Sequence, residues 1–330
     1  MFGQNIKKIE KTPEVFGMGS GIILAVVIAA AVLILLATAG AWLWAIAPSG
    51  KKADFREFQK YDYAHRGLHN IENKVPENSC TAFSLAVLGG FGMEFDLQLT
   101  KDKQIVVHHD NSIKRSCGVD KIISSMTLEE LRGYKLFGTE EKVPLFSEVL
   151  EVVGGKTPLI IELKGYNDPN ELCALTMEQL KAYKGLYCVE SFDPRIVRWF
   201  KDHHPELVRG QLMDRMKAGD EGLSASGAFF ARNLMTNWYN RPHFEAYNFK
   251  YRGILSLAVV RRLFGMQEVS WTLRTEQDYK KAKALGNLCI FEKFLPAGVE
   301  ETGKGRSYEQ LLAAAKAGAV CSATVQTKGR

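Results

Sequence analysis

A charge-free run from Gly21 to Ala47 is the feature that most constrains what this chain can fold into. Its sequence is GIILAVVIAAAVLILLATAGAWLWAIA. A helix of about 20 apolar residues crosses the hydrocarbon core of a bilayer, and this run is longer. Trp42 and Trp44 lie near its C-terminal end, where indole rings favour the membrane interface. The pattern predicts a transmembrane helix over residues 21–47, preceded by a polar N-terminal segment, residues 1–20.

The alternative for this run is a cleavable signal peptide, because Ala37-Thr38-Ala39 resembles a small-residue cleavage site. The run is too long for the apolar part of a signal peptide and begins late, so we expect an uncleaved, single-pass anchor in the cell membrane. Orientation is weakly determined, since basic residues flank both sides of the span. Before it lie Lys7, Lys8 and Lys11, and after it lie Lys51, Lys52, Arg56 and Lys60. The slight excess after the span favours a cytoplasmic location for the rest of the chain.

Composition describes an ordinary globular surface and excludes several classes of partner and site. The net charge is +6 with 24% charged residues, and no basic run is interleaved with aromatic residues, so we expect no nucleic-acid binding. The six cysteines are far apart and form no Cys-x-x-Cys pair, which argues against a zinc site and against a disulfide framework. Buried thiols of this kind are typical of a reducing compartment.

Residues 49–330 are predicted to form one α/β domain, because short apolar runs alternate with helical patterns. Their number is close to the roughly 250 residues of a TIM (β/α)8 barrel. The candidate strands are Tyr61–His65, Met93–Thr100, Gln104–His109, Leu159–Lys164, Leu186–Ser191, Leu207–Leu212, Phe244–Asn248, Glu268–Leu273 and Leu288–Phe291. Nine strands are one too many for this barrel, so we interpret Gln104–His109 as an extension outside it. The stretch Asp214–Arg241 has no clear period and is expected to be a helical insertion or loop.

Two of these strands carry acidic residues that a buried strand should not contain. Parallel barrel strands are apolar on both faces, yet Met93–Thr100 alternates and places Glu94, Asp96 and Gln98 on one face. That pattern also fits an exposed antiparallel strand. The strand before Lys164 is apolar except for Glu162, which shares a face with that lysine. Buried carboxylates need a cation or a hydrogen-bonded partner, and oxygen ligands favour Mg²⁺ or Ca²⁺ over zinc.

Histidines follow two apolar runs near these carboxylates. His65 ends the first strand, and the segment Val106-Val107-His108-His109-Asp110 closes the short run after the acidic strand. A single histidine at a strand end is more often structural than catalytic. Two of them at strand ends, where a barrel builds its active site, favour a catalytic interpretation.

In their order along the chain, these residues resemble the glycerophosphodiester phosphodiesterase family. The matching segments are HRG (65–67), PENS (76–79), Glu94-x-Asp96 followed by LTKD, VVHHD (106–110), Arg115, TLEEL (127–131), VPLFSEVL (143–150), IELK (161–164), Ser191-Phe192 and Trp271-Thr272. HRG alone is weakly informative, but the ordered set is specific and covers nearly everything after the apolar run. The resemblance implies a TIM barrel that uses a divalent cation and two histidines to convert glycerophosphodiesters to glycerol 3-phosphate and an alcohol.

Carried over residue by residue, the resemblance implies a complete set of site residues. Glu94, Asp96 and Glu162 would be the metal ligands, His65 and His109 the acid–base pair, Arg66 and Lys164 the phosphate ligands, and Trp271 part of the pocket lining. His69 and His108 would be structural, and Glu77 and Asn78 would shape a loop and cap the next helix. The chain departs from the family at 291–296, where Phe-Glu-Lys-Phe-Leu-Pro replaces the usual Thr-Asp before proline.

The mechanism implied by these residue types combines a cation that polarises a phosphoryl oxygen with proton transfer by two histidines. By the family's pattern the attacking group is a glycerol hydroxyl, which gives a cyclic phosphate that water then opens. The expected partners are a small glycerophosphodiester or lysolipid and the lipid bilayer. Two alternatives stay open: lysophospholipase D-like cleavage of membrane lysolipids, and a non-catalytic barrel that senses phospholipids.

Overall fold

The computed structural model describes residues 15–166, 168–296 and 306–317. The chain divides into two compact units, Met1–Ala45 and Ile46–Arg330. In the first unit, helix α1 begins at Val15 and continues to Ile46, and its stretch Gly21–Ile46 is long and apolar enough to cross a membrane. Its apolar side chains, such as Ile23 and Leu35, are exposed, as they are in a helix whose surroundings are lipid. This helix is a candidate for a single membrane span, although an N-terminal signal sequence has the same properties.

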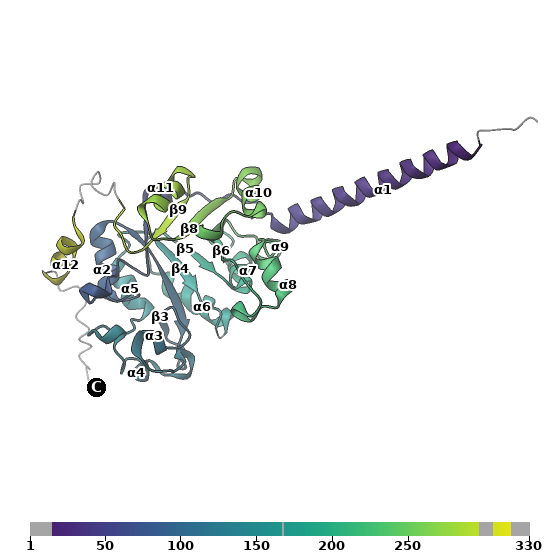
Figure 1. Cartoon of the computed structure of the whole chain (residues 1–330). Coiled ribbons are helices and arrows are strands. Elements are labelled where there is room, and N and C mark those ends of the chain that lie inside the picture. Colours follow the sequence, from purple (N-terminus) through teal and green to yellow (C-terminus); the bar gives the residue numbers. More distant parts are fainter. Residues whose placement is uncertain (1–14, 167, 297–305, 318–330) are drawn as a thin grey trace, which may run out of the picture. The chain divides into compact units, whose positions relative to one another are not determined.

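The second unit is a closed barrel of eight parallel strands, which confirms the predicted TIM fold (Figure 1). The barrel strands are β1 (Tyr63–His65), β2 (Gly92–Leu99), β4 (Leu159–Leu163), β5 (Tyr187–Ser191), β6 (Arg209–Met213), β7 (Phe244–Asn248), β8 (Gln267–Leu273) and β9 (Leu288–Phe291). Strand β1 pairs with both β2 and β9 and so closes the ring. The short strand β3 (Ile105–Val107) pairs with the barrel strand β2 and is antiparallel to it, so the predicted extension does lie outside the barrel.

Helices follow the strands around the outside of the barrel (Figure 1). They are α2 (Cys80–Gly89), α3 (Lys114–Cys117), α4 (Leu128–Leu131), α5 (Phe146–Val153), α6 (Pro169–Leu180), α7 (Pro194–His203), α8 (Ala225–Arg232), α9 (Asn237–Asn240), α10 (Leu255–Phe264), α11 (Glu276–Ala284) and α12 (Tyr308–Ala317). Short 3-10 turns are Phe58–Lys60, Ile71–Asn73, Ile123–Ser125, Leu136–Gly138, Asp220–Gly222 and Phe249–Tyr251. The predicted insertion at Asp214–Arg241 contains α8 and α9.

The first helix after the PENS segment corrects one expectation. Ser79 caps α2, because its side chain accepts a hydrogen bond from the backbone N–H of Ala82. Asn78 does not cap this helix. Its backbone lies in the left-handed region, with φ of 54°, and its amide points to Asp96 instead. Both residue types are common helix caps, so the sequence alone did not show that Ser79 rather than Asn78 has the backbone conformation of a cap.

Two apolar layers hold the barrel and leave one end polar. Outward-facing side chains of the strands, such as Phe95 and Ile161, pack against the helices. Inside the barrel, Ile160, Phe244 and Ile290 belong to a second buried cluster. Glu162 follows Ile160 by two residues on β4 and lies on the same, inward face of that strand. The barrel interior is therefore apolar near the strand starts and charged at the C-terminal ends, where this fold carries its active sites.

Candidate active site

Three buried carboxylates converge at the C-terminal ends of β2 and β4. Glu94 and Asp96 are two residues apart on β2, and Asp96 pairs in register with Glu162 of β4. One oxygen from each of the three lies within 4.8 Å of the other two. All three are at most 5% exposed. The alternating pattern of β2 thus turns its acidic face into the barrel, and the exposed antiparallel alternative is wrong for this strand.

The carboxylates do not share their negative charge equally. Burial, together with the charges of Asp96 and Glu162, raises the pKa of Glu94 well above its usual value. Burial likewise raises the pKa of Glu162 to about 8. Burial opposes ionisation of Asp96 as well, but the neighbouring Lys164 ammonium holds the pKa of Asp96 well below its usual range. Three like charges in so small a space raise one another's energy unless a further cation joins them.

Two basic residues are already engaged with this cluster. Lys164 Nζ lies 2.6 Å from Glu162 Oε1 and 2.8 Å from Asp96 Oδ1. The backbone N–H of Arg66 donates to Glu94 Oε2 at 3.2 Å, and its guanidinium Nε lies 3.6 Å from Asp96 Oδ2. Arg66 has a φ of 55°, in the left-handed region that side chains rarely occupy. Local strain of this kind concentrates at functional sites.

The carboxylate cluster fits a hard divalent cation. Mg²⁺ and Ca²⁺ are bound by oxygen at about 2.0–2.6 Å, so ligand oxygens around one ion lie within about 4–5 Å of each other. The observed 4.8 Å limit agrees with that spacing. A further carboxyl group lies nearby, because Glu190 of β5 pairs in register with Glu162 and is 1% exposed. Neither carboxylate oxygen of Glu190 has a hydrogen-bond partner among the described residues.

His65 is held by a carboxylate from the opposite end of the sequence. Glu292 Oε2 lies 2.7 Å from His65 Nδ1, and the other ring nitrogen, Nε2, lies 3.8 Å from Glu94 Oε2. Arg274 Nη2 contacts Glu292 at 3.2 Å. Burial lowers the pKa of His65 to about 4. Burial would raise the pKa of Glu292, but its hydrogen bond with His65 holds that pKa below the usual range.

His109 has the same kind of support from Asp110. Its Nδ1 lies 2.6 Å from Asp110 Oδ1, and Arg115 Nε donates to Asp110 Oδ2 at 2.6 Å. Arg115 also donates to Glu77 Oε1 at 2.7 Å, and that same oxygen accepts a hydrogen bond from Arg66 at 2.7 Å. A continuous chain of ion pairs therefore joins His109 to the loop after β1. Burial lowers the pKa of His109.

The neighbouring His108 is used for structure. It is 3% exposed, and its two ring nitrogens lie 2.9 Å from the Asp110 carbonyl oxygen and 2.8 Å from Ser116 Oγ. Gln98, the third polar residue of the β2 face, donates its amide to the carbonyls of His108 and Asp110. Both contacts fix the loop that presents His109.

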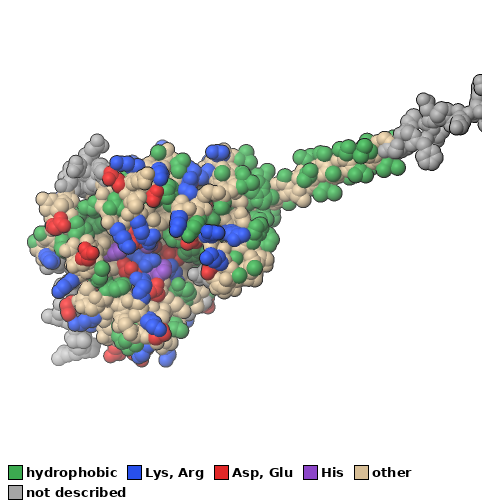
Figure 2. Space-filling model, viewed as in Figure 1, with side chains coloured by type: hydrophobic (Ala, Val, Ile, Leu, Met, Phe, Trp, Pro, Cys, Tyr) green, Lys and Arg blue, Asp and Glu red, His purple; other side chains and the backbone are tan. Residues whose placement is uncertain are grey.

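An open pocket of about 440 Å³ adjoins the cluster. Its lining includes His109, Glu162, Lys164 and Phe192. Trp271 is not part of that lining, but its ring packs edge-on against Phe192 with ring centres 5.7 Å apart. Figure 2 shows histidine, acidic and basic side chains gathered in the middle of the visible face of the barrel unit.

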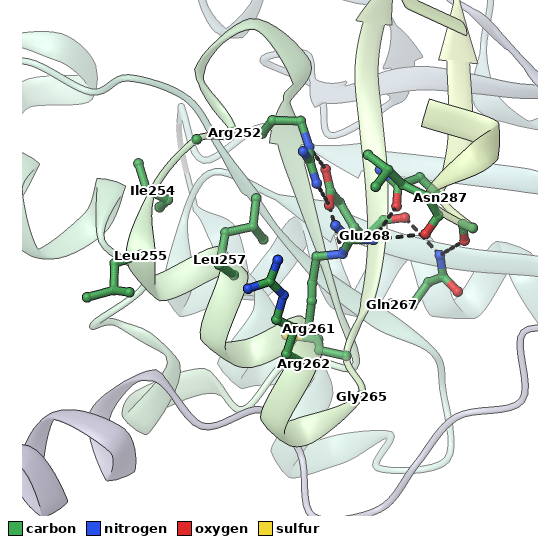
Figure 3. A pocket seen from close by; sticks show the side chains of 15 residues that line it. Arg252, Ile254, Leu255, Leu257, Arg261, Arg262, Gly265, Gln267, Glu268 and Asn287 are labelled. Carbon is green, nitrogen blue, oxygen red and sulfur yellow. Dashed lines mark hydrogen bonds and ion pairs between the residues drawn. The ribbon is translucent and has the colours of Figure 1, made fainter. Parts of the chain in front are cut away.

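A larger hollow of about 710 Å³ lies elsewhere, beside α10 and the first residues of β8 (Figure 3). In it, Arg252 and Arg261 converge on one carboxylate, Glu268, with contacts of 2.8 Å and 3.0 Å. Its lining residues include no histidine and no second carboxylate. The hollow lies at the N-terminal end of the strands, away from the carboxylate cluster, so it is not the candidate active site.

Comparison with known proteins identifies the family to which this barrel belongs. The family model described as "Glycerophosphoryl diester phosphodiesterase family" matches residues 65–295. The chain belongs to this family. It is accordingly a phosphoric diester hydrolase, and the match includes every site residue described above.

Relatives and solved structures agree with that family. A glycerophosphodiester phosphodiesterase of Caldanaerobacter subterraneus is 28% identical over 235 residues, which cover 66% of this chain and 87% of that protein. A lysophospholipase D of Rattus norvegicus is 34% identical over 142 residues, which cover only 39% of this chain and 44% of that protein. A phosphodiesterase of Oleispira antarctica, solved in complex with the product sn-glycerol-3-phosphate, is similar in fold with a TM-score of 0.59. It is 21% identical, and the superposition covers 74% of this chain and 97% of that one.

The sequence predicted the residues at the centre of the site better than those around it. The structure brings together His65, Arg66, Glu94, Asp96, His109, Glu162 and Lys164. Glu292, Glu77 and Asp110 were missed as members of the site, although each contacts a predicted residue, and so was Arg274, which contacts Glu292. The departure from the family pattern at 291–296 was the available signal for Glu292.

Proposed function

We propose that this chain hydrolyses glycerophosphodiesters to glycerol 3-phosphate and an alcohol, with a divalent cation and two histidines. One observation carries the proposal: His65 and His109 each have a carboxylate within 2.7 Å of Nδ1, while Nε2 of His65 lies 3.8 Å from Glu94 and His109 lines the pocket. A carboxylate at Nδ1 fixes the tautomer and orients the ring, as catalytic histidines require. The membership of the chain in the glycerophosphoryl diester phosphodiesterase family supports the substrate class.

The cation site in this proposal consists of Glu94, Asp96 and Glu162. When bound there, Mg²⁺ or Ca²⁺ supplies a positive charge that stabilises negative charge on phosphoryl oxygens. Lys164, whose ammonium lies 2.6 Å from Glu162, and Arg66 would then add positive charge for the phosphate. Lys164 contacts Asp96 and Glu162 of the cluster, and the Arg66 guanidinium lies between Asp96 and Glu77, so these side chains are already positioned at the site.

The proton transfers in this proposal belong to the histidines. One removes the proton from the attacking hydroxyl, and the other donates a proton to the departing alkoxide. His65 is held from behind by Glu292 and lies 3.8 Å from Glu94, so it acts beside the cation site. His109 lines the open pocket, and its Nδ1 contacts Asp110. We propose that Trp271 supports the pocket through Phe192.

The N-terminal unit suggests where the reaction takes place. We propose that residues 21–46 form an uncleaved membrane anchor and that the barrel lies on the cytoplasmic side. Among the described residues, Cys117, Cys173, Cys188 and Cys289 are free thiols and the last three are buried, which supports a reducing compartment. Proteolysis of sealed right-side-out and inverted vesicles, followed by detection of the barrel, tests this orientation: digestion only in inverted vesicles is expected.

A direct assay tests the proposed reaction. The purified chain is incubated with glycerophosphocholine and glycerophosphoethanolamine, in the presence of Mg²⁺, of Ca²⁺ or of EDTA. We expect glycerol 3-phosphate and the free alcohol with one of the cations and no turnover with EDTA. Release of a phosphorylated alcohol and free glycerol would show cleavage of the other ester bond and would contradict the proposal. Binding without turnover under every condition would favour a phospholipid sensor.

A further inference from the structure

The chain enters the barrel unit at a fixed place on its surface. The unit begins at Ile46, where the apolar stretch 21–46 ends. The Ile46 carbonyl accepts a hydrogen bond from Asn237 of α9 at 3.1 Å, and the Ala47 carbonyl accepts one from Arg241 at 2.7 Å. With the apolar stretch in a bilayer, as proposed above, the surface around this entry point lies next to the lipid headgroups.

Three exposed basic side chains follow near the entry point, and they have no ion pair among the described residues. Lys51 and Lys52 line a hollow of about 240 Å³ that also includes Gly265, at the end of α10. Lys52 Nζ lies 3.7 Å from the position that a Cβ atom on Gly265 would occupy, so this lysine lies beside that helix end. Arg262, in the last turn of α10, lines the larger hollow (Figure 3).

The acidic side chains around these hollows leave most of that positive charge uncompensated. Asp54 is paired with Arg56 at 2.6 Å. Glu268 is buried and bound by two arginines. Glu206, which lines a third hollow together with the two lysines, is 72% exposed and contacts His204 at 3.3 Å. Among the described residues that line the three hollows, one carboxylate without a lysine or arginine partner therefore faces three such basic side chains.

Exposed apolar side chains accompany these charges. Leu263 directly follows Arg262 and is 63% exposed. Leu255, seven positions before Arg262 and so on the same face of α10, is 71% exposed. On α9, Trp238 is 49% exposed and adjoins Asn237, which holds the entry point. Basic residues with leucines on one helix are typical of helices that lie at a membrane surface, and indole rings are favoured at the same depth.

We propose that this surface binds the headgroups of anionic phospholipids and so docks the barrel on the bilayer. We call it the juxtamembrane patch, and it consists of Lys51, Lys52, Trp238, Arg262 and Leu263. The inference goes beyond the phosphodiesterase function and rests on the proposed anchor. The two lysines precede β1, and the end of α10 precedes β8, so these parts of the patch lie toward the N-terminal ends of the strands. The catalytic groups lie at the opposite ends, which docking leaves open to the aqueous phase.

Charge complementarity sets the expected size of the effect. Each lysine or arginine at an anionic membrane surface favours binding by about fivefold. This attraction falls off within about 8 Å at physiological ionic strength, so it weakens when salt is added. A zwitterionic lipid such as phosphatidylcholine carries no net charge and gives no such gain. The choice of lipid and the salt concentration therefore distinguish the patch from an anchor that acts alone.

The test measures how fast a water-soluble amine reagent labels individual lysines. The full chain is reconstituted in nanodiscs of phosphatidylcholine or of an equal mixture of phosphatidylcholine and phosphatidylglycerol, and mass spectrometry gives each initial labelling rate. The ratio of the rate in phosphatidylcholine to the rate in the mixture defines the protection. We expect a protection of about fivefold or more for Lys51 and Lys52, which added salt removes. Lys74, an exposed residue in the loop after β1, should show none.

Two charge reversals separate docking from tethering. Arg262→Glu leaves the anchor and both reporter lysines unchanged, and it should reduce their protection to within about twofold of unity, because it turns attraction at the patch into repulsion. Lys280→Glu is the matched control. It changes the net charge by the same amount on α11, where the side chain of Lys280 is 69% exposed, and it should leave the protection unchanged.

Each contrary outcome overturns a defined part of the inference. Equal labelling of Lys51 and Lys52 in both lipids would overturn the patch and leave the anchor and the phosphodiesterase function intact. The same loss of protection in Arg262→Glu and Lys280→Glu would show attraction by net charge alone and would likewise overturn the patch. Protection of Lys74 would mean that the barrel docks with its catalytic end. Release of the full chain from the nanodiscs would overturn the anchor and the patch together, whereas the phosphodiesterase assay would stand.

Discussion

The Nδ1 of His65 lies 2.7 Å from Glu292 Oε2, although 227 positions separate the two residues along the chain. Strands β1 and β9 pair directly and close the barrel, which brings the ends of the fold together at this contact. A carboxylate at this position keeps the proton of the ring on Nδ1 and leaves Nε2 free to accept one. The segment 291–296, which departs from the family pattern, therefore contributes Glu292, a carboxylate that orients His65.

Replacing this carboxylate should impair turnover more than folding. Glu292→Gln can still contact Nδ1 but no longer fixes the tautomer, and we expect kcat to fall by at least tenfold. The corresponding loss in a serine protease triad is ~10⁴-fold. Glu292→Asp should recover part of the activity. Arg274→Ala removes the other partner of Glu292 and should have a smaller effect on kcat, which steady-state kinetics of all three variants will measure.

The two histidines should differ in their response to the leaving group. His65→Ala and His109→Ala should each lower kcat/KM by the ~10²–10⁴-fold typical of general acid–base groups. The double variant should be little worse than the poorer single one, because groups that act as a unit are not additive. A nitrophenyl ester needs little protonation as it departs, so it should rescue only the variant that lacks the acid.

His108→Ala is the control for this comparison. Its ring is hydrogen-bonded to the Asp110 carbonyl and to Ser116, so we expect lower thermal stability with near-normal activity below the unfolding temperature. An inactive but stably folded His108→Ala variant, together with a healthy His109→Ala variant, would exchange the roles of the two residues.

Metal binding should depend on the carboxylate cluster and not on the neighbouring Glu190. Glu94→Ala or Asp96→Ala should weaken binding of Mg²⁺ or Ca²⁺ in calorimetric titration by at least tenfold and abolish turnover. The fold should survive, because removing one of several crowded carboxylates relieves repulsion. Burial raises the pKa of Glu190 well above its usual value, so Glu190→Gln should leave metal affinity within a few-fold. A large loss in that variant would make Glu190 a fourth ligand.

The sequence predicted the centre of the site because its residues are local to two strands. Alternation along β2 placed Glu94 and Asp96 on one face, and the polar end of β4 contributed Glu162. Parallel neighbours end at the same edge of the barrel, which brings the two pairs together. Residues that support the histidines followed no such rule. Glu77 and Arg115 meet across 38 positions, and only the three-dimensional path of two loops determines that contact.

The helices of the insertion after β6 could not be predicted from the sequence for a related reason. Helices α8 and α9 have 8 and 4 residues, which is too short for an apolar period to emerge. Polar contacts rather than an apolar stripe attach α9 to the barrel: Asn240 donates to Gln211, and Asn237 donates to Glu245 at 2.8 Å. Buried polar pairs of this kind leave no periodic pattern in the sequence.

The barrel should fold without the apolar helix, and the position of the cut should affect its stability. A chain that begins at Ser49 loses the fully buried side chain of Ile46 and the carbonyls that accept from Asn237 and Arg241. We expect chains beginning at Ile46 and at Ser49 to be soluble and active. The shorter one should be less stable by roughly 2–3 kcal/mol in urea unfolding. Aggregation or inactivity of both, beside an active full chain in detergent, would mean that the barrel requires the helix.

The Glu245 carboxyl should make the barrel less stable as the pH rises. Burial raises the pKa of Glu245 from 4.5 to about 8, against the opposing hydrogen bond from Asn237. Because the pKa in the folded state lies above the unfolded value, the stability that this group contributes is complete below about pH 4.5. That contribution is lost as the pH rises through about 8. A tenfold difference in the acid dissociation constant corresponds to about 1.4 kcal/mol, so the loss of folding free energy is a few kcal/mol.

Glu245→Gln keeps the shape and cannot ionise, so its free energy of unfolding should fall less between pH 5 and pH 8.5 than that of the unmodified protein. Urea unfolding at a series of pH values measures the difference, which should grow in favour of the variant as the pH increases. Glu206→Gln is the matched control, because the side chain of Glu206 is 72% exposed and its replacement should leave the profile unchanged. Parallel profiles for the unmodified protein and Glu245→Gln would mean that Glu245 is ionised in the folded barrel at neutral pH. A cation or water would then lie beside Oε2 of Glu245, which has no hydrogen-bond partner among the described residues.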